Sequence, residues 1–183
     1  MMIRTTLKYL ALCLGLLLFL HPEESYAQQY HVDLGLRSQK AFGLYFENGI
    51  VAQFSSDSIA PKRLYLGIGF ISSRLGSALG SNAIKQDNYQ IWLAYYLKKD
   101  HQLRPFFSLG TGYFKADYES PDFKVLDQRS PLLSVTAGLE WASPYQVKVN
   151  LALGYNIISG NGEKGPGTLY PTFAQLNFFY PLR

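Results

Sequence analysis

Cysteine is nearly absent from this chain of 183 residues, and its single copy, Cys13, lies in an apolar segment at the N-terminus. Without a second cysteine the chain cannot form an internal disulfide, so hydrogen bonding and packing must stabilise it. Long apolar runs are also scarce. The longest, residues 9–20, is shorter than the roughly twenty residues that a membrane-spanning helix needs. The sequence therefore gives no indication of a helical membrane anchor.

Motifs for catalysis and metal binding are missing too. Beyond the N-terminal segment two histidines remain, His31 and His101, and they lie far apart in the sequence. Their separation and the lack of cysteine argue against a zinc site. The acidic residues at 117–122 lack the spacing of an EF-hand calcium loop, and the glycines at 160–167 are not followed by the lysine of a P-loop. We expect no metal ion, no cofactor and no catalytic centre.

Strong charge of either sign is absent as well. Lys and Arg number 17, Asp and Glu number 13, and the formal net charge is +4. No basic run is interleaved with aromatic residues, so nucleic acid is not an expected partner.

The N-terminal segment has the composition of a secretory signal peptide. The positive residues Arg4 and Lys8 precede an apolar stretch at Tyr9–Leu20. Small residues then occupy the cleavage positions in Ser25–Ala27. We therefore predict that residues 1–27 form a cleaved signal peptide. Residues 28–183 are expected to form one exported domain that contains no cysteine.

The chain is rich instead in short segments that alternate apolar with small or polar residues. In Val147–Ile157 every odd position is apolar or aromatic, whereas Lys148 and Asn150 occupy even positions. A period of two is typical of a β-strand with one apolar face. Such segments recur about eight times, at residues 30–38, 42–54, 63–72, 88–98, 105–117, 131–142, 147–157 and 169–180. Asn48 and Gly49 interrupt the second segment, where we expect a local distortion.

This series predicts an all-β fold, namely a closed antiparallel up-and-down transmembrane β-barrel of about eight strands. A sheet can span hydrocarbon only if it closes on itself and leaves no unpaired edge. The aromatic content of 15%, with 14 tyrosines, suits the aromatic girdles of such a barrel. Long and short connections should alternate. The sequence fits with long connections at 73–87, 118–130 and 158–168 and short ones at 99–104 and 143–145, while 39–41 and 55–62 depart from the rule.

The alternation also predicts which charged residues face the interior. The inward positions hold Asp33, Arg37, Glu47, Glu140 and Lys148, which we interpret as a lumenal polar network whose members satisfy one another. A three-residue turn at 143–145 would place Glu140 opposite Lys148, so we expect these two side chains to neutralise each other. A proton or ion path is the alternative role, for which so narrow a barrel leaves little room.

On this pattern the sequence after residue 27 resembles the small eight-stranded outer-membrane proteins, the family that includes OmpX-like, OmpW-like and OmpA-like barrels. Its style is similar to barrels from Bacteroidetes-like bacteria. Phe178 and Tyr180 look like the aromatic positions of the C-terminal signal that the outer-membrane assembly machinery recognises, although residues 181–183 follow them. We therefore expect an outer-membrane monomer that contacts membrane lipid and lipopolysaccharide, is inserted by that machinery, and has a structural or surface-binding role.

Two alternatives remain open. A soluble lipocalin-like barrel would have inverted faces, so that the apolar face of 147–157 would line a ligand cavity. A lipid A-modifying barrel enzyme would need a histidine near the outer leaflet. His31 is predicted to face the lumen and His101 to lie in a periplasmic turn, which favours a non-catalytic protein.

Overall fold

The computed structural model describes residues 30–41, 45–60, 63–75, 84–98, 100–118, 129–157 and 171–182. The predicted signal peptide and most of the predicted long connections lie outside these residues. The described elements are β1 (Tyr30–Ala41), β2 (Tyr45–Ser56), β3 (Leu64–Ser72), the short 3-10 helix η1 (Ser73–Leu75), β4 (Ile84–Tyr96), β5 (Leu103–Tyr118), β6 (Arg129–Ala142), β7 (Lys148–Asn156) and β8 (Thr172–Leu182). None of the described helical residues belongs to a helix long and apolar enough to cross a membrane.

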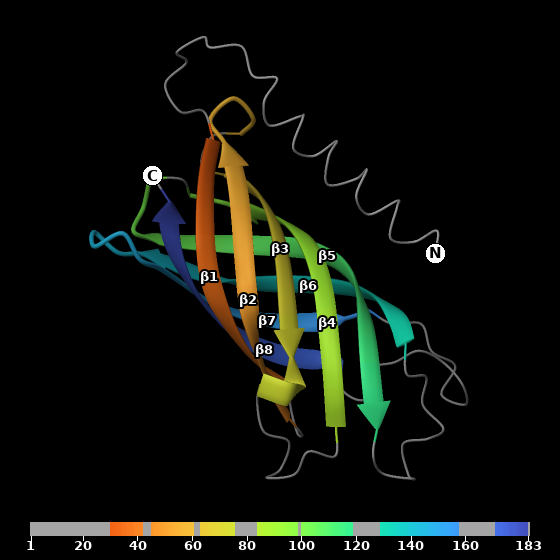
Figure 1. Ribbon diagram of the computed structural model, residues 1–183. Helices are drawn as coiled ribbons and strands as arrows, with labels where there is room; N and C mark the ends of the chain where they lie inside the picture. Colours follow the sequence, from red (N-terminus) through yellow and green to blue (C-terminus); the bar gives the residue numbers. More distant parts are fainter. Residues whose placement is uncertain are drawn as a thin grey trace, which may run out of the picture.

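Each strand pairs antiparallel with its neighbour in the sequence, and β1 also pairs with β8, so the sheet closes into a barrel (Figure 1). Leu36, for example, lies opposite Ile50 of β2 on one side and Phe178 of β8 on the other. Closure gives the edge strands their hydrogen-bond partners, which an open sheet would leave exposed. The predicted closed up-and-down barrel is confirmed.

The two ends of the barrel differ. β1 begins and β8 ends at one end, which we call the terminal end and which also carries the connections 57–63, 97–102 and 143–147 (Figure 1). The opposite end, which we call the loop end, carries the connections 42–44, 73–83, 119–128 and 157–171. The three longest connections are therefore all at the loop end, as the alternation rule predicts.

Side chains separate onto two faces of the sheet. The outward face is apolar and exposed along the strands, as at Leu34, Ile50, Ile91, Leu109, Leu139 and Leu153. The inward face is buried and mixes aromatic with polar side chains, as at Tyr65, Tyr96, Phe106, Gln53, Glu140 and Asn177. The predicted strand faces are confirmed by this separation.

The predicted distortion of the second strand is wrong. Asn48 and Gly49 pair without interruption with Ser38 and Arg37 of β1. A Cβ atom at Gly49 would collide with the carbonyl oxygen of Phe70. This glycine therefore allows the backbone of β3 to approach β2 closely, and no extra residue is inserted into the ladder.

Several strand boundaries also differ from the predicted ones. β4 begins at Ile84, before the predicted start at residue 88, and β1 continues to Ala41 through the predicted first loop. β5 begins at Leu103, so Arg104 belongs to a strand and not to a turn. Most of these extra residues are polar or charged, and apolar alternation is a weak signal where a strand extends beyond its apolar band.

Candidate functional site in the barrel lumen

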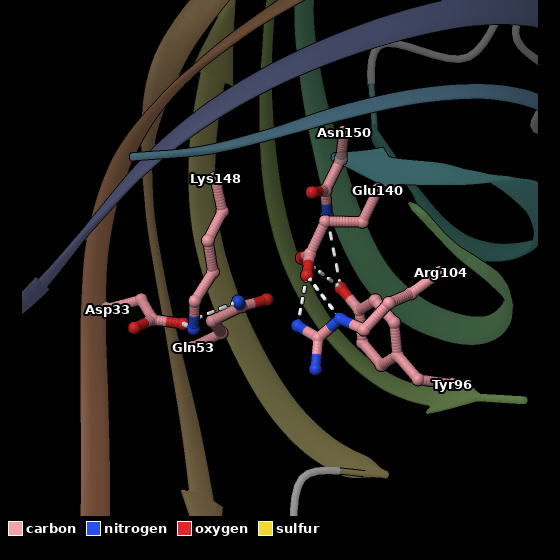
Figure 2. Close-up of polar contacts among 7 residues, drawn as sticks. All are labelled: Asp33, Gln53, Tyr96, Arg104, Glu140, Lys148 and Asn150. Carbon is pink, nitrogen blue, oxygen red and sulfur yellow. Dashed lines mark hydrogen bonds and ion pairs between the residues drawn. The ribbon is translucent and has the colours of Figure 1, made fainter. Parts of the chain in front are cut away.

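The lumen near the terminal end holds a buried cluster around Glu140. The Glu140 side chain on β6 is fully buried and lies opposite Arg104 of β5 in the strand register. Arg104 Nε donates a hydrogen bond of 2.8 Å to Glu140 Oε1, and the same carboxylate forms an ion pair with the Arg104 guanidinium. Tyr96 Oη donates to Glu140 Oε2 at 2.9 Å, and Asn150 Nδ2 donates to Tyr96 Oη at 3.1 Å (Figure 2). Arg104, Tyr96 and Asn150 thus form one hydrogen-bonded network around the buried Glu140 carboxylate.

A second cluster forms around Asp33 at the same end. Lys148 Nζ from β7 lies 2.6 Å from Asp33 Oδ2, and Gln53 Nε2 from β2 donates to the same oxygen at 2.7 Å (Figure 2). The Lys148 ammonium also lies 5.4 Å from the centre of the Tyr65 ring. Asp33 is buried, whereas the Lys148 side chain keeps 17% of its surface exposed. The ion pair therefore lines a cavity at the terminal end.

That cavity has a volume of about 240 Å³. Its lining includes Asp33, Lys148, Arg104 and both histidines of the described residues. His31 Nε2 lies 3.0 Å from Asp57 Oδ2, and both of these side chains are partly exposed. His101 is exposed in the connection between β4 and β5. The described residues contain no group of three or more histidine, cysteine or carboxylate side chains placed to hold a metal ion.

Arg37 occupies the middle of the lumen. Its Nε donates to Asn177 Oδ1 at 2.7 Å and its Nη1 donates to Gln90 Oε1 at 2.9 Å. The guanidinium carbon lies 4.3 Å from the centre of the Trp92 ring, within the range of a cation–π contact. A cavity of about 10 Å³ remains beside these side chains, space for roughly one water molecule. Arginine and tryptophan thus fill the barrel at its midpoint.

Glu47 anchors the lumen near the loop end. Gln39 Nε2 donates to Glu47 Oε2 at 3.0 Å, and Asn88 Nδ2 donates to Glu47 Oε1. Gln86 Nε2 in turn donates to Asn88 Oδ1 at 2.8 Å. Side-chain amides from β1 and β4 therefore solvate this buried carboxylate in the place of water.

All five residues of the predicted network lie inside the barrel, but the structure joins them differently. Asp33 and Lys148 contact each other, whereas Arg37, Glu47 and Glu140 belong to separate clusters. The predicted pair of Glu140 with Lys148 is wrong. Ala142 lies opposite Lys148, so Glu140 lies opposite Asn150. The connection runs from 143 to 147, longer than the predicted three-residue turn, and this shifts the register by two residues.

Among the described residues, Arg104 is the charged lumenal residue that sequence reasoning missed. Its even position places it on the same face as Phe106 and Ser108, so the alternation of β5 carried the signal once the strand is extended to Leu103. Proline at 105 concealed it, because proline usually marks the start of a strand or a turn. Nothing in the local sequence indicated that Arg37 would contact Gln90 of β4 and Asn177 of β8.

The fold is shared with known outer-membrane barrels. The N-terminal β-barrel domain of Pseudomonas aeruginosa OprF matches with 12% identity and a TM-score of 0.61, covering 86% of this chain and 100% of that one. Outer membrane protein OprG of the same organism matches with 15% identity and a TM-score of 0.50, covering 84% and 95% of the two chains. Neisserial surface protein A matches with 13% identity and a TM-score of 0.50, covering 86% and 99%. No protein-family model and no curated protein sequence matches the chain.

These matches establish the fold class, the small β-barrel of outer-membrane proteins. At such low sequence identity they show the fold alone and do not assign a function to this chain. The resemblance to Bacteroidetes-like barrels and the cleaved signal peptide stay predictions.

Proposed function

We propose that this protein is an integral outer-membrane β-barrel with a structural or surface-binding role and no catalytic activity. The observation that carries the proposal is the sorting of the two faces. Large apolar side chains cover the outside of the closed barrel, whereas ion pairs and amides fill its lumen. An outer surface of this kind is suited to lipid, because in water a contiguous apolar patch of this size promotes association.

The height of the apolar band supports a spanning position. On β5 the exposed apolar residues run from Leu103 to Tyr113, a difference of ten residues. At about 3.4 Å per residue and a strand tilt of about 40°, that length corresponds to about 26 Å along the barrel axis. The apolar band of outer-membrane barrels is about 25 Å tall. The next outward residue on β5 is the exposed Lys115, where the band ends.

Aromatic side chains flank this band at both ends. Trp141 is exposed opposite Leu103 at the terminal end, and Phe70 and Tyr89 pack at 5.2 Å between ring centres toward the loop end. Rings at these depths match the interfacial girdles of membrane barrels. Because long connections face the outside of the cell, we assign the loop end to the cell exterior and the terminal end to the periplasm. The connections at the loop end are then the candidates for contact with a surface partner.

The same sorting argues against the lipocalin-like alternative, which needs an apolar lumen and a polar exterior. The position of the histidines argues against the lipid A-modifying alternative. His31 and His101 both lie at the terminal end, and His31 contacts Asp57. In the proposed orientation that end is periplasmic, away from the outer leaflet.

Closure of the barrel supports a monomer, because β1 and β8 pair with each other and leave no strand edge for a partner. Within β8, Phe178 and Tyr180 point outward and Pro181 and Leu182 continue the strand. We propose that the assembly machinery reads these outward aromatic residues and tolerates the short extension after them.

Fractionation of cells that express the full-length chain tests the location. Outer and inner membranes are separated by density, and the recovered protein is run on a gel with and without boiling. We expect recovery with the outer membrane and a shift in migration on boiling, because the closed barrel resists detergent until heated. Recovery in the soluble periplasm, without a shift, would overturn the proposal.

Mass analysis of lipid A from the same cells tests the absence of catalysis. The proposal predicts an identical set of lipid A masses with and without expression. A new species that has lost or gained an acyl chain, and that disappears in the His31→Ala variant, would show that the barrel is an enzyme.

A further inference from the structure

The outer wall of the barrel carries an apolar groove across β1 to β5, with a volume of about 790 Å³. Ligand sites commonly measure about 300–1,000 Å³. Ala52 and Thr111 are the small outward residues of its floor, and Ile50, Ile91 and Phe70 line it beside them. The Thr111 hydroxyl donates to the carbonyl of Leu132 at 3.2 Å, so its polar group is satisfied within the sheet. The groove therefore offers hydrocarbon an almost wholly apolar surface.

Aromatic rings border the groove on the side of the loop end. Tyr89 lies directly opposite Phe70 on β3 and Tyr113 on β5, and all three residues line the groove. Tyrosine concentrates where membrane hydrocarbon gives way to headgroups. The end of the groove that these rings border is therefore the end that meets the headgroups.

Two positive charges follow immediately beyond this aromatic border. Lys115 lies directly opposite Arg129 of β6, and both side chains are exposed on the outward face. Lys115 is two residues beyond Tyr113, a distance of about 7 Å along the strand. Like charges directly opposite each other destabilise a sheet, so this pair favours an anion between the two side chains.

The nearby acidic residues neutralise this border only in part. Asp87, which lies opposite Lys115 on β4, accepts hydrogen bonds from Ser72 Oγ at 2.5 Å and Arg74 Nε at 3.3 Å. Asp117 lies one outward position further along β5, opposite Lys85. Among the described residues of β3 to β6 and η1, this border carries four positive and two negative outward side chains. They are Arg74, Lys85, Lys115 and Arg129, and Asp87 and Asp117. The excess is positive where the groove ends.

We propose that the groove and the Lys115–Arg129 pair together bind one molecule of a phosphorylated outer-leaflet lipid of the lipid A type. An acyl chain lies in the groove, and a phosphate accepts charge-assisted hydrogen bonds from Lys115 and Arg129. Charge complementarity selects this occupant, because a second copy of the chain would bring another pair of positive charges to the same border. The assignment rests on the proposed outer-membrane location, which puts the loop end in the outer leaflet.

Native mass spectrometry of the refolded protein in detergent tests this site. The probes are diphosphoryl lipid A, dephosphorylated lipid A and inorganic phosphate alone. We expect one diphosphoryl lipid A per barrel, and binding weaker by about tenfold or more for the dephosphorylated lipid and for the K115Q/R129Q variant. The A52L variant fills the groove and is expected to weaken both lipids without affecting their difference. Phosphate alone should bind too weakly to detect, because it gains nothing from the groove.

The R63Q/K98Q variant is the matched control, since it removes the same charge from exposed residues at the terminal end. It should bind diphosphoryl lipid A as the wild type does. The assignment would be overturned by an equal loss of lipid A binding in both double variants. Equal affinity for both lipids, or a dimer that excludes lipid, would overturn it as well. Outer-membrane recovery of each variant is measured in parallel. If the wild type does not reach the outer membrane, the proposed function is overturned as well. If the K115Q/R129Q variant inserts correctly and binds lipid as the wild type does, only the lipid site is overturned.

Discussion

Arg104 on β5 and Glu140 on β6 lie directly opposite each other and form an ion pair that is buried inside the barrel. Tyr96 donates a further hydrogen bond to the same carboxylate. A buried pair of this kind adds little net stability over apolar residues, but breaking it leaves one buried charge without compensation. The pair therefore specifies how β5 and β6 are joined more than it strengthens the fold.

Replacing Glu140 alone should strongly destabilise the barrel. Glu140→Leu leaves the Arg104 guanidinium buried without its carboxylate, and we expect the free energy of unfolding to fall by about 3–5 kcal/mol. The double variant R104M/E140L should recover most of that loss. Urea unfolding in lipid vesicles, followed by tryptophan fluorescence, measures both. A single variant as stable as the wild type would show that the pair is not buried.

The partner of Lys148 can be identified by double-mutant cycles. The structure joins Lys148 to Asp33, so Asp33→Asn and Lys148→Gln should be coupled by about 1 kcal/mol in unfolding free energy. Glu140→Gln and Lys148→Gln should add independently, because Asn150 and not Lys148 lies opposite Glu140. Coupling confined to the Glu140–Lys148 cycle would instead support a three-residue turn between β6 and β7.

Gly67 is required by the ring of Trp92. A Cβ atom at Gly67 would lie 2.0 Å from Trp92 Cε2, whereas at Gly69 its nearest contact would be 3.0 Å from Val51 Cγ1. Gly67→Ala should therefore cost about 1–3 kcal/mol through overpacking and shift the fluorescence of Trp92. Gly69→Ala serves as the control and should cost less, because the neighbouring side chain can move. Equal effects at the two positions would contradict this packing.

The lipid-facing surface should reject charge at mid-height. Leu109 is outward and near the middle of the apolar band of β5, so Leu109→Arg should destabilise the inserted barrel by about 2–4 kcal/mol. Tyr145→Arg, in the exposed connection between β6 and β7, should have almost no effect. Unfolding from lipid vesicles provides the comparison. Tolerance of arginine at position 109 would place that residue in water.

Alternation was sufficient to predict the strands and their faces. Successive side chains of a strand point to opposite faces of the sheet, so an odd or even residue number decides which face a side chain occupies. Leu139 outward and Glu140 inward follow from parity, whatever strand lies beside them. Register depends on turn length as well. The connection at 143–147, which includes Gln146 at a φ of 63°, moved Lys148 away from Glu140 while leaving it on the predicted face.

Lumenal partners needed three-dimensional information. Asp33 and Lys148 are 115 residues apart and come from β1 and β7, which are not neighbours in the sheet. Arg37 contacts Gln90 across the lumen from β4. The parity of each residue predicts that it faces inward, but the curvature of the closed barrel decides which inward residues meet.

In the proposed membrane-spanning barrel, the odd positions of β6 face lipid and the even positions face a filled polar lumen. Spin labels on single cysteines, introduced into a Cys13→Ser background and reconstituted in vesicles, report collisions with dissolved oxygen, which concentrates in hydrocarbon. We predict high oxygen access at the outward positions and low access at the inward ones, measured at Leu133, Val135, Ala137 and Leu139 and at Ser134 and Thr136. High access at the even positions, or no alternation along the strand, would contradict this assignment of the two faces.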